Sequence, residues 1–390
     1  MSKKLISFLV MISVCLLAPS AIQAQTYTDV SPSYWGYDEI EYITDKGAIH
    51  GYTDGTYRAG NTVTREQAFV IIQRAFQLET ANRPAPSFQD ISPNHWTYPA
   101  IAAIVDEGWY PDGATLVPKE GLTRKEMAHI ISNAFDLEAS GQEQLFIDVP
   151  GNHPYFEGVQ ALAANRISQG FGNAEFKPDK TLTRAEFAAF VARAMEESFR
   201  SETIAAPPKQ KIVVEETSGY GATLKVYEKV NGTYEQVFET MNAVLGKDGA
   251  GQTWEGDPKT PVGTYSLGTG FGWGDKPAGM TYPYRGVDDN DYWIDDSSSA
   301  NYNQWVEYGG NPYARWNSFE RLNIDLYKHA VAINYNKNPT VPGAGSAIFL
   351  HVWRGAGSPT LGCIAVSEPN IEKIMNWLDE DKHPFIEIHP

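Results

Sequence analysis

The stretch SAIFLHVWRGAGSPTLGCIAV, residues 346–366, determines the fold that we expect for the second half of the chain. Its first residues alternate, so that Leu350 and Phe349 face opposite sides of a strand and His351 shares the side of Phe349. The Gly- and Pro-containing loop RGAGSPTLG follows, and the apolar residues 364–366 predict a second strand. A loop of this kind can fold back and bring Cys363 beside His351.

The runs around this stretch also have a period of two, which predicts a mainly β domain over residues 211–390. They are KIVVEE, ATLKVYEKV, GTYEQVFET, HAVAINYN and PFIEIHP. Asn231 and Gly232 mark a hairpin between two of them. The segment EPNIEKIMNWLDED is the one strong helix pattern of this half. Residues 200–210 contain Pro207 and Pro208 near their end, which indicates a linker that is stiff there.

The amino terminus explains why Cys363 is unusual. Residues 1–24 combine Lys3 and Lys4 with an apolar run and end in alanine, which indicates a secretory signal peptide. Its removal takes away Cys15 and leaves Cys363 as the one cysteine of the mature chain, so an internal disulfide is excluded. Such a cysteine forms an intermolecular disulfide, reacts as a thiol, or is a buried and inert side chain.

A nucleophilic thiol needs a base, a group that holds the base, and donors for the oxyanion. His351 is the best candidate for the base, the alternative being a hydrogen-bonded core histidine. A protonated neighbour would lower the thiol pKa from about 8.5. Gly362 permits a sharp turn, so that the amides there can converge on an oxyanion. One Cys and one His at this spacing do not make a zinc site, and we expect no metal and no cofactor.

The charge of the chain limits its partners. The whole sequence has a net charge of −17, and removal of Lys3 and Lys4 leaves 29 basic against 48 acidic residues, or −19. This charge argues against nucleic acid and against a basic membrane-binding patch. Because no later segment is apolar enough to span a bilayer, any attachment to a surface must come from a binding module.

Three similar segments occupy the first half of the chain. They open at residues 27, 88 and 146 with an aromatic residue, any residue, Asp and an aliphatic residue, which places Asp29, Asp90 and Asp148 at matched positions. Trp35 and Trp96 mark the start of an apolar-periodic helix in the first two segments. Each segment then has a turn and a second helix.

The second helices begin with VTREQ, LTRKE and LTRAE. Thr64, Thr123 and Thr183, with Gln or Glu three residues later, predict capping boxes. The arginines that follow them, at positions 65, 124 and 184, have no such explanation, because a cation in the first turn opposes the helix dipole. An anionic ligand at these helix starts would explain all three.

These segments resemble S-layer homology (SLH) repeats, with boundaries at residues 25–84, 85–142 and 143–199. The resemblance implies an all-α, pseudo-threefold helical spindle whose grooves bind a pyruvylated secondary cell-wall polymer of Gram-positive bacteria. The alternative is a purely structural repeat. The second repeat departs from the family with YPDGATLVP, and the third has His153 near the usual Trp, so we expect at least one degenerate groove. The implied polymer-binding residues are Arg65, Arg124, Arg184, Asp29, Asp90, Asp148, Trp35 and Trp96.

The stretch 346–366 resembles the active-site segment of L,D-transpeptidases of the YkuD type, and TPVG at residues 260–263 resembles a second element of that family, which shapes the substrate cleft. The resemblance implies a β-sandwich in which Cys363 attacks a peptidoglycan stem peptide and passes the acyl group to an amine of another stem. His351 would be the base, Gly362 and Cys363 would supply oxyanion amides, and Thr360 would shape the loop. Leu361 and Ala365 replace the common His and Arg, which indicates a divergent subgroup.

Together the two halves predict a multidomain, secreted, wall-anchored acyltransferase at the surface of a Gram-positive-type bacterium. The alternatives are an L,D-carboxypeptidase that uses water as acceptor, and an inactive S-layer or wall-binding protein. The aromatic-rich insert within residues 267–317 is either a glycan-binding surface or a lid over the sandwich. Its acidic residues lack the regular spacing of a calcium loop. They are Asp288, Asp289, Asp291, Asp295 and Asp296.

Overall fold

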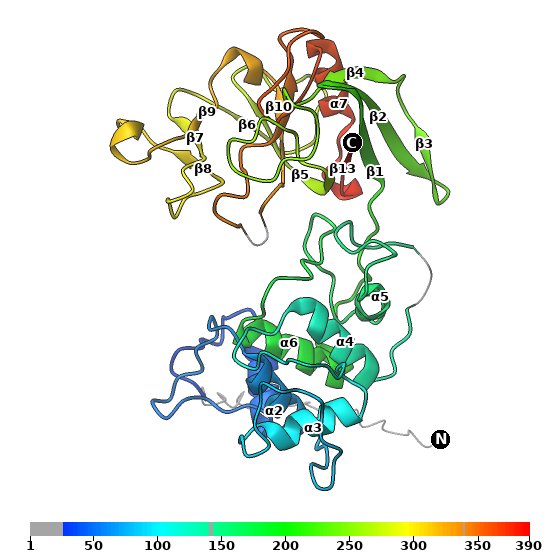
Figure 1. Ribbon diagram of the computed structural model, residues 1–390, viewed down its shortest axis with the longest axis vertical. Coiled ribbons are helices and arrows are strands. Elements are labelled where there is room, and N and C mark those ends of the chain that lie inside the picture. Colours follow the sequence, from blue (N-terminus) through cyan, green and yellow to red (C-terminus); the bar gives the residue numbers. More distant parts are fainter. Residues whose placement is uncertain (1–25, 140–142, 338–339) are drawn as a thin grey trace, which may run out of the picture.

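The computed structural model describes residues 26–139, 143–337 and 340–390. A helical half and a β half follow each other along the chain, and β1 leads from the first into the second (Figure 1). The predicted signal peptide, residues 1–24, lies outside the described residues. Among the described helices, none combines the length and the apolar composition that crossing a bilayer requires.

Each of the three segments of the first half contributes two helices, as predicted. Thr64, Thr123 and Thr183 each accept a hydrogen bond from the backbone of the residue three positions on, and the side chain of that residue bonds back, so all three capping boxes are confirmed. The helices are α1 (Tyr37–Asp45), α2 (Arg65–Ala75), α3 (Tyr98–Asp106), α4 (Arg124–Ala134), α5 (Phe156–Ala164) and α6 (Arg184–Met195), followed by the short η1 (Glu197–Phe199).

The three segments interlock in a ring. Helix α1 packs against α6, α3 against α2, and α5 against α4, so the first helix of each segment contacts the second helix of another segment. Backbone bridges join the strand-like residues before the second helices, pairing Thr62 with Thr183, Thr64 with Gly121, and Thr123 with Thr181. The middle segment therefore occupies a position equivalent to those of its neighbours.

One aspartate closes the loop of each segment. Both carboxylate oxygens of Asp29 accept backbone N–H groups, those of Tyr57 and Arg58, at 2.6 and 2.8 Å. Asp90 accepts from residues 116 and 117, and Asp148 from residues 176 and 177, in the same manner. The resemblance assigned these aspartates to polymer binding. In the structure their oxygens are already used, which gives them a structural role.

The β half differs from the expected β-sandwich. Eight strands form one sheet in the order β1-β13-β5-β10-β11-β12-β4-β2, and β2 also pairs with β1, so the sheet closes on itself. The closure depends on the parallel pairing of β1 with β13 near the carboxyl terminus. The closed sheet is built from β1 (Gln210–Ser218), β2 (Gly221–Val230), β4 (Met241–Val244), β5 (Gly263–Gly272), β10 (Ala330–Ile333), β11 (Phe349–Val352), β12 (Ile364–Val366) and β13 (Phe385–His389).

Two short strands extend this sheet. The predicted hairpin at Asn231 and Gly232 joins β2 to β3 (Thr233–Gln236), and both turn residues have positive φ, as this tight turn requires. Strand β6 (Tyr284–Gly286) pairs with β5. Helix α7 (Glu368–Trp377) confirms the predicted helix, and its Ile371, Ile374 and Met375 join the apolar core inside the closed sheet.

The aromatic-rich insert covers the outer face of β10 and β11. Together with the residues that follow it, the insert forms a three-stranded sheet of β8 (Gln304–Glu307), β7 (Asp291–Ile294) and β9 (Glu320–Arg321). Trp293 and Tyr327 pack there with Phe349 and Cys363 in one buried cluster. The acidic residues of the insert also hold its loops. Asp291 accepts from Arg285 and from Trp305 Nε1, at 2.8 and 2.7 Å.

The third repeat contacts the β half directly. Ser266 of β5, fully buried, accepts a hydrogen bond from Asn173 Nδ2 at 2.9 Å and donates one to Glu175. Beside this polar contact, Phe385 of β13 packs with Ile147 and Ala174. An ion pair between Lys229 and Glu143, at 2.7 Å, lies at the same boundary. The two halves are thus joined by side chains as well as by the linker.

Candidate functional site

The register of β11 and β12 brings Cys363 and His351 to the same face. These strands run parallel, with Leu350 opposite Ile364 and His351 opposite Ala365. Leu350 and Ile364 lie in the core inside the closed sheet, whereas Phe349 and Cys363 lie in the cluster on the outer face. Since side chains alternate along a strand, His351 also lies on the outer face, as the sequence predicted.

The thiol of Cys363 is buried, with 9% of the residue exposed. Its sulfur accepts the backbone N–H of Phe349 and donates to the carbonyl of Ala347, each at 3.4 Å. Among the hydrogen bonds of the described residues, none joins Cys363 to His351. Tyr327 connects the two instead: its ring lies edge-on to the His351 ring with centroids 5.2 Å apart, and its hydroxyl interacts with the thiol.

Both members of the pair are uncharged at neutral pH. Burial raises the pKa of Cys363 to about 12, although the Phe349 amide opposes the shift. Burial also lowers the pKa of His351 to about 4. The Nδ1 of His351 lies 2.8 Å from the Val352 carbonyl, which can only accept, so Nδ1 carries the proton and Nε2 is left as the base.

The His351 environment predicts a loss of stability in acid. The folded protein holds the pKa near 4, below the ordinary value of 6.5, so the unfolded chain binds a proton first as the pH falls. The stabilisation is complete above about pH 6.5, is lost towards pH 4, and amounts to about 3 kcal/mol. We expect the difference in unfolding free energy between pH 7 and pH 4.5 to be smaller in His351→Gln, as measured by urea denaturation. An unchanged difference would contradict the burial of a neutral His351.

Two threonines fix the turn before the thiol. The Thr360 hydroxyl accepts the Gly362 amide at 3.2 Å and donates to the Cys363 carbonyl at 2.6 Å. Thr260, fully buried, donates to the same carbonyl at 3.3 Å. Gly362 has φ +136°, a conformation that residues with a side chain rarely adopt. The Gly362 amide therefore has a partner in this conformation, which leaves the Cys363 amide as the oxyanion donor to test.

Tyr327 and Glu320 were missed by the sequence analysis. Tyr327 donates to Glu320 Oε1 at 3.1 Å, and burial raises the pKa of that carboxyl above its ordinary value. These residues precede the thiol by 36 and 43 positions, and only the packing of the insert brings them to it. The one available signal was that HAVAINYN, which begins two residues after Tyr327, predicted a strand.

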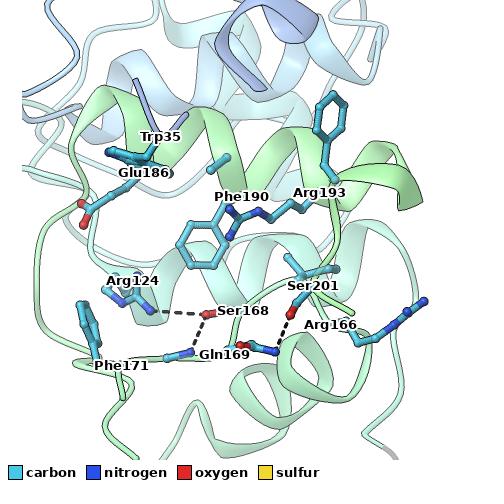
Figure 2. Close-up of a pocket in the computed structure, with 14 residues that line it drawn as sticks. Trp35, Arg124, Arg166, Ser168, Gln169, Phe171, Glu186, Phe190, Arg193 and Ser201 are labelled. Carbon is cyan, nitrogen blue, oxygen red and sulfur yellow. Dashed lines mark hydrogen bonds between the residues drawn. The ribbon is translucent and has the colours of Figure 1, made fainter. Parts of the chain in front are cut away.

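A groove of about 470 Å³ lies between the three repeats (Figure 2). Trp35 of the first repeat, Arg124 of the second and Phe171 of the third line it. Arg124 donates to the Phe176 carbonyl at 2.7 Å and lies over the rings of Phe171 and Phe176. It forms no ion pair with the described residues, and burial lowers its pKa to about 10. The groove therefore contains a largely buried cation that makes no direct ion pair, although the carboxylates of Glu186 and Asp148 lie near enough to favour its charged form.

Arg184 repeats this arrangement against the first repeat. It donates to the carbonyls of Tyr57 and His50 at 2.9 and 3.1 Å and lies over the Tyr57 ring. Within the described part of the chain it too has no carboxylate partner. The turns beside both arginines need glycine, since a Cβ on Gly51 or Gly170 would lie 2.3 Å from an aromatic ring.

Arg65 differs, because two carboxylates neutralise it. Its Nε donates to Glu126 at 2.7 Å and its Nη1 to Glu120 at 3.1 Å. Burial acts to lower the pKa of Arg65, but the bonds to Glu126 and Glu120 raise it above the ordinary value. Tyr110, from the unusual turn of the second repeat, donates to the same Glu126 oxygen at 2.8 Å. The charge of Arg65 is thus balanced within the protein, unlike the charges of Arg124 and Arg184, which make no ion pair among the described residues.

The predicted aromatic contacts are exposed. Trp35 and Trp96 are 56% and 63% exposed, although such large side chains are usually buried in part by the fold. By the order of the repeats, Trp96 corresponds to Trp35, and Pro154 stands at this position in the third repeat. The structure therefore brings Trp35 together with Arg124, and leaves no tryptophan at the third position.

Family comparisons agree with this division of the chain. Residues 212–386 match the L,D-transpeptidase catalytic domain, YkuD. Residues 26–69 and 145–188 match the S-layer homology domain. These two segments are the first and third repeats, whose turns lie against Arg184 and Arg124.

Curated relatives match about half of the chain. The chain is 28% identical over 57% of its length to the "Surface-layer 125 kDa protein" of Lysinibacillus sphaericus, covering 19% of that protein. It is 30% identical over 51% of its length to "S-layer protein sap" of Bacillus anthracis, covering 25% of it. The chain thus spans a quarter or less of the length of these relatives.

A solved structure matches part of the chain weakly. The cell shape determining protein Pgp2 of Campylobacter jejuni aligns with 46% of this chain and 47% of its own, at 22% identity and a TM-score of 0.28. A score at this level does not support an argument from structure.

Proposed function

From the premise that this chain consists of S-layer homology domains followed by a YkuD L,D-transpeptidase catalytic domain, we propose that it is a wall-anchored cysteine acyltransferase acting on peptidoglycan stem peptides. The observation that carries the proposal is the shared outer face of β11 and β12, where His351 and the thiol of Cys363 both contact Tyr327. The Nε2 of His351 is the base, and Cys363 is the nucleophile.

In the first half-reaction, Sγ of Cys363 attacks the carbonyl carbon of the L,D-peptide bond of the donor stem while its proton passes to His351 Nε2. The oxyanion that forms is stabilised by the Cys363 amide. The C–N bond then breaks, and the leaving amine takes the proton from His351. An amine of the acceptor stem attacks the resulting thioester, gives its proton to His351, and displaces the sulfur, which recovers the proton.

Without substrate, Cys363 and His351 are both neutral and do not form a thiolate–imidazolium ion pair, because the pKa of the thiol is raised and the pKa of the imidazole is lowered. Activation therefore requires the donor peptide to enter the site and to lie against the sulfur before the proton moves. Tyr327, which contacts both groups, is the positioning residue between them.

The helical half anchors the enzyme through Arg124, in its groove, and through Arg184. At each position a guanidinium that makes no direct ion pair with a described residue lies beside aromatic rings, a combination that binds an anionic sugar polymer. A pyruvylated secondary cell-wall polymer has this chemistry, since its ketal carboxylates supply the anion.

The test is a product assay with purified disaccharide-tetrapeptide. Formation of a cross-linked dimer with loss of the terminal residue, measured by mass spectrometry, supports transfer. Formation of tripeptide alone would identify an L,D-carboxypeptidase in which water replaces the amine. If neither product forms and the thiol is not acylated by a carbapenem, the enzyme assignment fails and a structural wall protein remains.

A further inference from the structure

Lys337 is a half-buried cation that neither the fold nor the mechanism explains. Three cationic side chains of the described residues have a lowered pKa: Arg124, Lys177 and Lys337. Arg124 lines the groove described above, and Lys177 lies 3.8 Å from Glu175. Lys337, whose pKa burial lowers to about 8, forms no ion pair with any described carboxylate.

The ammonium group of Lys337 belongs to the wall around the thiol. It lies 4.1 Å from the ring centroid of Trp293 and donates to the backbone carbonyl of Asn303. The Trp293 ring in turn packs edge-on against Phe349, with centroids 5.1 Å apart, and both rings are in the cluster that contains Cys363.

Asn303 links Lys337 to the sulfur through a chain of contacts. Its Oδ1 accepts Trp293 Nε1 at 2.8 Å and the amide of Ala347 at 3.4 Å. The carbonyl of Ala347 accepts the thiol of Cys363. Asn303 is 1% exposed, so this chain is a fixed part of the site. It places the ammonium two residues away from the reacting sulfur.

A half-buried cation without a counter-ion is costly, and an anion that reaches it is bound strongly. The acyl donor of the proposed reaction carries carboxylates close to the bond that is cleaved. We propose that Lys337 binds a carboxylate of the donor peptide and thereby selects donors that carry this charge. This inference rests on the proposed function, because it names a substrate group for the same thiol.

Two carboxylates of the donor could supply this charge: the one at its carboxyl terminus, and the one on the side chain of a diamino acid. Three synthetic tetrapeptides separate them, namely the free acid, the terminal carboxamide and the side-chain carboxamide. For the wild-type protein we expect kcat/KM to fall about 10- to 100-fold on one of the two amides, as loss of a charged hydrogen bond requires. That amide identifies the carboxylate.

The decisive comparison is between Lys337→Met and the wild type. The variant is expected to lose most of its kcat/KM on the free acid and to discriminate less than threefold against the amide. Lys337→Arg keeps the charge and should retain part of the discrimination. The matched control is Lys373→Met, since Lys373 also lies over an aromatic ring, Phe238, but is exposed on α7. This control should discriminate as the wild type does.

Equal loss of activity on all three donors in Lys337→Met, or unchanged discrimination, would overturn the proposal. The proposal would also be overturned if Arg354→Met, rather than Lys337→Met, lost the discrimination between free acid and amide. Arg354 is the exposed cation that follows His351 along the chain.

The role of Lys337 can be tested even if the protein turns over none of the three peptides. Calorimetric binding of the free acid and the amides to Cys363→Ala, with and without Lys337→Met, measures the same discrimination without chemistry. If the wild type turns over no donor while Cys363→Ala prefers the free acid and the double variant does not, the proposed reaction fails and the Lys337 site stands. If no preference for the free acid is seen, the Lys337 site fails.

Discussion

Replacing Cys363 by alanine is expected to reduce turnover of the tetrapeptide by at least about 10⁴-fold and to abolish acylation by carbapenems. Removal of a nucleophile eliminates the covalent intermediate, and the residual rate comes from binding alone. Cys363 is the one cysteine of the described residues, so labelling by a carbapenem reports on this position. Mass spectrometry of the intact protein measures the labelling directly.

The same variant tests whether the thiol is inert. The thiol makes two weak backbone contacts, at 3.4 Å each, and one contact with the Tyr327 hydroxyl, in a cluster whose other members are large rings and aliphatic side chains, so alanine should leave the protein folded. Binding to wall sacculi should also be unchanged. Turnover in Cys363→Ala within a factor of ten of the wild type would contradict the assignment. His351→Gln should show acylation slowed by about 10²-fold or more, because general-base assistance is lost.

The three motif arginines are expected to separate into two classes. Arg124→Ala and Arg184→Ala should each weaken binding to the wall polymer by about 10-fold or more, the effect of a charge-assisted hydrogen bond. Arg65→Ala should change binding by less than twofold, because Glu126 and Glu120 already neutralise its charge. Pull-down with purified sacculi over a range of protein concentrations measures the three affinities.

Although Arg65 should matter little for polymer binding, its replacement should clearly lower the free energy of unfolding. Its removal leaves Glu126, whose side chain is 5% exposed, without its cation, and breaking such a buried pair costs about 3 kcal/mol. The double variant Arg65→Met/Glu126→Gln removes both charges and should recover most of this loss. Weakened binding in this double variant, with its fold intact, would show that the second-repeat groove contributes to anchoring after all.

Local patterns in the sequence determined much of the site. The Thr-Arg helix starts fixed the capping boxes, because the bonds lie within three residues. The alternation of residues 346–353 placed His351 on the face of Phe349, and the closure of a short loop put Cys363 on the same face. These inferences needed no knowledge of distant parts of the chain.

What the sequence could not provide depends on distant pairings. The sheet closes because Lys211 pairs with Phe385, at opposite ends of the domain, and no local pattern distinguishes this arrangement from two stacked sheets. Likewise, Glu126 neutralises an arginine 61 positions earlier, and Tyr327 contacts a thiol that lies 36 positions later. Contacts between distant residues therefore decide whether a charged group or a hydroxyl is available to a ligand or is already paired within the protein.

The hydrogen bonds that join Ser266 to Asn173 and Glu175 limit how the β half can move relative to the third repeat. The loop of residues 168–175 lines the Arg124 groove at one end and joins β5 of the catalytic domain at the other. An enzyme held in this way does not sweep a sphere around its attachment point, as one on a free tether would. Under the proposed function, it would act at a fixed distance and orientation from each polymer chain, so the spacing of the polymer in the wall would be copied into the spacing of the bonds that the enzyme makes.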